Sequence, residues 1–168
     1  MTFIQVCIYF NFLLLNYLTT MFEQIYITGL ISAASEIGSY IVSGTMFEKL
    51  GVRSTYLISL GIATLGGILI IAYGLDHQES VSFPIFFSLC RFGICSAFNM
   101  IVVANSTIFE VKRAATALGT PMFLARLSQS SSPLIATLAQ PIPMYIFCVT
   151  NTVCAIFSYF LKVPPKQR

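Results

Sequence analysis

The chain has 168 residues, of which 57% are hydrophobic and only 9% are charged, with a formal net charge of +3. Its mean hydropathy is +0.84. Because a soluble domain carries about 25% charged residues, this composition excludes an ordinary water-soluble domain and predicts an all-α integral membrane protein.

The apolar sequence divides into six runs, each long enough to cross a bilayer, since about 20 apolar residues span roughly 30 Å of hydrocarbon as a helix. Polar segments such as "EKLGVRS" and "DHQES" separate the runs, which are too continuous for the alternating strands of a β-barrel. We predict one six-helix transmembrane bundle over residues 1–162 and a short basic tail, 163–168. The predicted spans are 3–21, 25–47, 55–74, 82–107, 114–138 and 142–162.

The first run, "MTFIQVCIYFNFLLLNYL", is preceded by no basic residue, and the first lysine or arginine is Lys49. A secretory signal has a basic n-region and a small-residue cleavage site. We therefore expect this run to be retained as the first spanning helix.

Basic residues follow only the even-numbered spans. Of nine lysines and arginines, two lie inside predicted spans, and the other seven flank the spans. Since basic residues concentrate in cytoplasmic loops, the alternation predicts that both termini are cytoplasmic and that the acidic loop with Asp76 and Glu79 faces the other side. The seven flanking residues are Lys49, Arg53, Lys112, Arg113, Lys162, Lys166 and Arg168.

Three charged residues, Glu36, Arg91 and Arg126, fall near the centres of predicted spans. At that depth an ionised side chain costs roughly 2.5–3.5 kcal/mol on insertion scales. A structural ion pair between Glu36 and either arginine would neutralise two charges and leave the other arginine over. The remaining arginine would have to be stabilised by water, backbone carbonyls or an anionic ligand. A water-filled cavity with a net positive charge would accommodate all three residues.

The fifth run supports this interpretation, because Pro121 and Pro133 bracket Arg126 and "SQSSS" lies between Arg126 and Pro133. Proline bends a helix, and a bent, serine-rich helix is tolerated against protein or a water-lined cavity. Alternatively, some of the serines simply allow close packing of helices.

Other chemistry is absent from the sequence. His77 is the only histidine and no cysteines form a C-x-x-C pair, so we expect neither a metal site nor a cofactor. No nucleophile–base pair suits an enzyme, and we expect no nucleic-acid partner. The cysteines are most simply apolar packing residues: Cys7, Cys90, Cys95, Cys148 and Cys154.

Several of these residues also follow a known family pattern over most of the chain, from about residue 25 onward. The spaced residues are Ile25, Tyr26, Glu36, Glu48, Lys49, Gly51, Arg91, Gly93, Asn105, Arg126 and Pro133. In this spacing the chain resembles the C-terminal half of a major facilitator superfamily transporter, most of all the organic cation, anion and carnitine transporter family. It departs from that pattern at Val52, Thr107 and Glu110, where the family gates its cytoplasmic side.

The resemblance implies that the six helices correspond to helices seven to twelve of a twelve-helix transporter, whose two bundles rock about a central substrate site. It implies transport of a small organic anion or zwitterion, with Arg126 contacting the carboxylate. Arg91, Glu36 and Tyr40 would line the same cavity. The cytoplasmic gating loop would contain Glu48, Lys49, Gly51 and Arg53.

The expected partners are a small organic solute, the lipid bilayer, and either a six-helix N-terminal half or further copies of this chain. Because the family's N-terminal bundle is missing from these 168 residues, the chain would be a half or fragment of a transporter. The alternative is a non-transporting half-bundle that acts as an interaction or regulatory membrane subunit.

Overall fold

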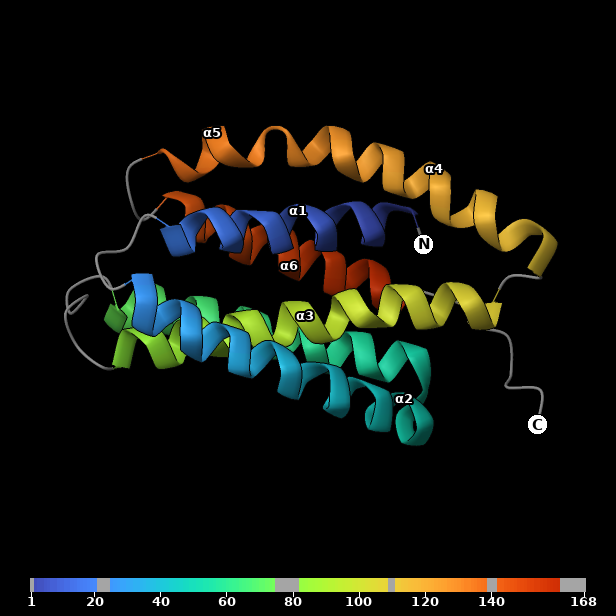
Figure 1. Cartoon of the computed structure of the whole chain (residues 1–168), viewed down its shortest axis with the longest axis horizontal. Helices are drawn as coiled ribbons and strands as arrows, with labels where there is room; N and C mark the ends of the chain where they lie inside the picture. Colours follow the sequence, from blue (N-terminus) through green and yellow to red (C-terminus); the bar gives the residue numbers. More distant parts are fainter. Residues whose placement is uncertain (1, 21–24, 75–81, 109–110, 139–141, 161–168) are drawn as a thin grey trace.

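The computed structural model describes residues 2–20, 25–74, 82–108, 111–138 and 142–160, and nearly all of these are helical (Figure 1). The predicted tail and the acidic loop lie outside the described residues. The elements are α1 (Thr2–Thr20), α2 (Ile25–Leu69), the π-helix η1 (Ile70–Gly74), α3 (Ser82–Ile108), α4 (Val111–Gln129), α5 (Ser132–Ala136) and α6 (Ile142–Tyr159).

Four helical segments are long and apolar enough to cross a membrane, by length and composition: α1, α2 with η1, α3 and α6. This agrees with the predicted all-α membrane class. The prediction of six separate spans is met only in part, because the described residues form five long helices. The predicted span 114–138 is not among the four: α4 has 19 residues but includes three basic residues and is less apolar than the other long helices, and α5 has only five residues.

Two predicted spans, 25–47 and 55–74, share the element α2. The intervening "EKLGVRS" was expected to form a loop, yet only Gly51 leaves the helical conformation, with φ 79° and ψ 173°. That region of backbone space is essentially restricted to glycine. The chain reverses direction there, so one glycine replaces the predicted loop between the two arms (Figure 1).

The helices run alongside one another, with α4 and α5 on one side of the bundle and α2 on the other (Figure 1). α1 contacts α4, α5, α6 and α3, whereas α3 packs most extensively on α2. Their buried apolar side chains form one continuous core. α1 therefore connects the α4–α5 layer to the rest of the bundle.

The α2–α3 contact depends on residues without bulky side chains. A β-carbon at Gly93 would lie 2.5 Å from both the Ala63 nitrogen and the Ser59 carbonyl oxygen. The hydroxyls of Ser59 and Ser96 also hydrogen-bond across this contact at 2.7 Å. Such small residues let helix backbones approach closely, which is how helices associate where lipid competes for apolar surface.

We expect Gly93→Ala to lower the free energy of unfolding by about 1–3 kcal/mol, because the added methyl group forces α3 away from α2. Gly61→Ala is the matched control, since a β-carbon there meets open space, and it should be neutral or stabilise by about 0.5–1 kcal/mol. Reversible unfolding in mixed micelles, followed by circular dichroism, measures both. Equal stability of the two variants would contradict the close helix approach.

Candidate functional site

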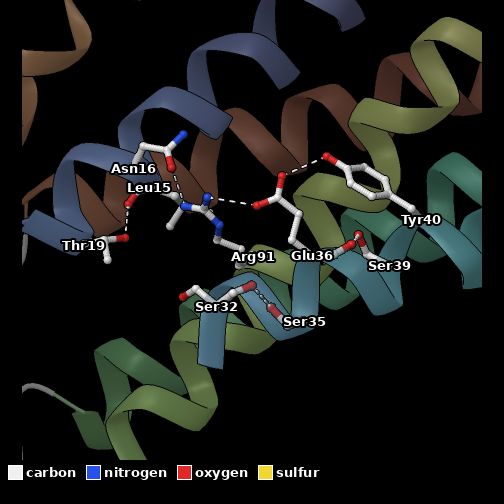
Figure 2. A network of polar contacts seen from close by, with 9 residues as sticks. All are labelled: Leu15, Asn16, Thr19, Ser32, Ser35, Glu36, Ser39, Tyr40 and Arg91. Carbon is white, nitrogen blue, oxygen red and sulfur yellow. Dashed lines mark hydrogen bonds and ion pairs between the residues drawn. The ribbon is translucent and has the colours of Figure 1, made fainter. Parts of the chain in front are cut away.

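Arg91 on α3 lies at the centre of a polar network that joins three helices (Figure 2). Its Nη1 donates a hydrogen bond to Oδ1 of Asn16 on α1, and its Nη2 lies 3.2 Å from Oε2 of Glu36 on α2. The hydroxyl of Tyr40 donates to the other carboxylate oxygen of Glu36 at 2.8 Å. Three of the four predicted substrate-site residues are therefore brought together.

This ion pair is largely withdrawn from the surface, with side-chain exposures of 12% for Arg91 and 24% for Glu36. The Arg91 guanidinium also lies 5.5 Å from the centroid of the Phe12 ring, a cation–π distance. Its Nε is buried without a hydrogen-bond partner. Glu36 therefore matches the charge of Arg91, and the guanidinium is held between Glu36, Asn16 and the Phe12 ring.

Arg126, the fourth predicted site residue, lies apart from this network. Its side chain is exposed, and its Nη1 has only a long 3.4 Å hydrogen bond, to Oε1 of Gln129. The amide of Gln129 is buried and donates in turn to the backbone oxygen of Tyr9 on α1 at 3.1 Å. Among the described residues Arg126 forms no ion pair, so it is the arginine that Glu36 leaves unpaired.

One face of α1 connects the two arginines. Tyr9, Phe12 and Asn16 are spaced three and four residues apart, so they share a side of the helix. Arg91 contacts the Asn16 end of this face, and Gln129, the partner of Arg126, contacts the Tyr9 end. The two ends are roughly 10 Å apart at 1.5 Å per residue.

The chain leaves the helical path one turn after Arg126. α4 ends at Gln129, and α5 begins at Ser132 with Pro133 in its first turn. The hydroxyls of Ser128, Ser130 and Ser131 donate to the carbonyls of Leu124, Leu127 and Ser128 at 2.6–3.0 Å. These three hydroxyls donate to nearby backbone carbonyls, whereas the charged guanidinium of Arg126 is a strong donor to anions.

The predicted gating residues gather at the reversal in α2. Glu48 and Lys49 are exposed beside Gly51. The guanidinium of Arg53 lies 4.3 Å from the ring centroid of Tyr159, near the end of α6. This contact joins the segment after the reversal of α2 to the end of α6.

Sequence reasoning missed the amides. Asn16 completes the Arg91 network, and Asn11 on α1 donates to the Oδ1 of Asn151 on α6 at 3.1 Å while accepting from Thr150 at 2.8 Å. These amides could have been identified from the sequence, because a buried amide in an apolar run, like a buried charge, requires a hydrogen-bond partner.

No model of a known protein family matches the chain.

We expect Glu36→Ala to lower the free energy of unfolding by about 3 kcal/mol, because Arg91 would be left as a mostly buried charge with only Asn16. The exposed Glu48→Ala is the control and should change the stability by less than about 0.5 kcal/mol. In a double-mutant cycle, Arg91→Ala with Glu36→Ala should cost less than the sum of the single variants. Additive losses in micelle unfolding would contradict the pairing.

Proposed function

We propose that this chain is one half of a transporter of the major facilitator type, similar to the organic cation, anion and carnitine transporters. It moves a small organic anion or zwitterion across a membrane by alternating access. Arg126 contacts the solute carboxylate, while Arg91, Glu36 and Tyr40 form a structural or coupling group in the same cavity. Both termini lie in the cytoplasm, as the basic residues predict.

One observation carries the proposal: Glu36 pairs with Arg91, and Arg126 is exposed without a carboxylate partner among the described residues. An uncompensated guanidinium on an otherwise apolar bundle needs an anion or water. A carboxylate ligand satisfies it well, because the guanidinium can donate two parallel hydrogen bonds to the two carboxylate oxygens.

The structure around Arg126 also supports a role for this position in binding. Gln129 connects Arg126 to the backbone of α1. The buried amide of Gln129 therefore orients the guanidinium on the same helix. The break between α4 and α5 follows within one turn. Interrupted helices beside a charged residue are typical of solute sites in transporters.

We expect Arg126→Ala to reduce uptake of a labelled organic monocarboxylate by about tenfold or more, since it removes a charge-assisted hydrogen bond worth about 1.5–3 kcal/mol. The full chain, with any six-helix partner that co-purifies, is reconstituted in liposomes for the assay. A carboxylate zwitterion should be affected in the same way, and a quaternary ammonium cation should not.

Arg168→Ala, in the predicted C-terminal tail, is the matched control because it removes an equal charge outside the bundle. Arg126→Lys should restore part of the uptake, because the positive charge remains while the bidentate geometry is lost. Equal uptake by the Arg126→Ala variant and the unaltered chain would remove Arg126 from the binding site.

The second candidate is a non-transporting half-bundle that associates with a larger transporter as a regulatory subunit. The composition of α4 favours it, because that helix is not among the four segments apolar enough to cross a membrane alone, and protein would cover its polar surface. Co-purification with a full transporter, without uptake by the reconstituted chain, would identify this role and exclude the first.

A further inference from the structure

The α1–α6 interface places two cysteines opposite each other. The helices run in opposite directions, and three contacts fix their register. Asn11 hydrogen-bonds Asn151, the Cys154 Sγ lies 3.8 Å from the Ile4 carbonyl oxygen, and Phe3 contacts Phe157 with ring centroids 4.6 Å apart.

Cys7 falls between these contacts. It lies one turn from Ile4 and one turn from Asn11, on the α1 segment that faces Cys154. The two thiols are within hydrogen-bonding reach of each other, and both are free in this structure. Cys154 is buried, whereas Cys7 is partly accessible. The pair therefore has one thiol that a small reagent can reach and a second thiol directly behind it.

We propose that Cys7 and Cys154 are a redox modification site, a dithiol that an apolar organic hydroperoxide oxidises to a disulfide joining α1 to α6. An apolar oxidant fits because Cys7 lies on an apolar helix that is long enough to enter a membrane, where such a hydroperoxide also concentrates. This inference does not depend on the proposed transport function.

The reaction balances in two steps. The Cys7 sulfur attacks the terminal peroxide oxygen, the O–O bond breaks, and the products are a Cys7 sulfenic acid and an alcohol. The Cys154 sulfur then attacks the Cys7 sulfur, the S–O bond breaks, and water leaves with the thiol proton. Two thiols are oxidised to one disulfide, while the hydroperoxide is reduced to alcohol and water.

The other cysteines provide an internal comparison. Cys148, also on α6, packs toward α2, where a β-carbon on Gly67 would lie 2.6 Å from its Sγ. Cys95 lies close to Arg91 and Glu36 at the α2–α3 contact. Cys148 thus faces α2 and Cys95 lies beside the Arg91–Glu36 pair, whereas Cys7 faces Cys154. A disulfide from Cys7 should therefore be specific for Cys154.

Trypsin places Cys7 on one peptide and Cys148 and Cys154 together on another. Cleavage after Lys49, Arg126 and Lys162 yields peptide 1–49, which contains Cys7 alone, and peptide 127–162, which contains Cys148 and Cys154. The full chain in liposomes is treated with cumene hydroperoxide, the remaining thiols are alkylated, and the chain is denatured and digested. Tandem mass spectrometry then identifies the linked peptides, and fragmentation between residues 148 and 154 shows which cysteine carries the link.

We expect more than half of peptide 1–49 to be linked to peptide 127–162 through Cys154, and dithiothreitol to release it. Cys7→Ser and Cys154→Ser should abolish the link, whereas Cys148→Ser, on the same peptide, should leave it unchanged. The unaltered chain gives the answer even if a variant folds poorly. Cys7 that stays alkylatable, or that links to Cys148, to Cys95 or to a second copy of peptide 1–49, would overturn the proposal.

Discussion

The arrangement of α1, α2 and α3 depends on the charge of Arg91. α1 and α2 have few direct contacts, and Arg91 on α3 reaches both, through Asn16 and Glu36. In surroundings of low polarity neither charge is tolerated alone, so separating any of the three helices leaves a buried polar group unsatisfied. The pair therefore contributes more to the relative positions of the helices than to the net stability.

α1 is joined by polar contacts to each of its main neighbours. These contacts join it to α3 through Asn16, to α6 through Asn11, and to α4 through the Tyr9 carbonyl. Interhelical hydrogen bonds of this kind contribute only about 0.6 kcal/mol each in membranes. Their importance lies in register, since a shifted helix would bury an amide or a charge without a partner. Packing of the apolar surfaces holds the helices together, and the hydrogen bonds of the amides favour one register over the others.

Helix extent depends on local apolar runs, whereas helix register depends on a few polar contacts between distant residues. This difference explains which features could be predicted from the sequence. The extents of α1, α3 and α6 follow from unbroken apolar runs, and they lie within a few residues of the predicted spans. The single-residue reversal at Gly51 was not predictable, because a polar segment signals a break without revealing its backbone path. Which arginine pairs with Glu36 depends on helix placement, which no local pattern contains. Asn16 could have been found, because an amide in an apolar run carries the same signal as a charge.

The helix that carries Arg126 exposes most of its described side chains. Among the residues of α4 and α5 whose side chains the structure describes, the buried ones form a narrow stripe: Pro121, Ala125, Gln129, Ser132 and Ala136. The remaining surface includes the exposed arginine, so in a membrane this face needs a polar neighbour. In a transporter the carboxylate of the solute would neutralise Arg126, and in a regulatory subunit a carboxylate of the partner protein would do so. A solute carboxylate must leave when the site empties, whereas a partner protein's carboxylate stays. The exchange rate of the anion at Arg126 therefore separates the two functions more directly than the fold does.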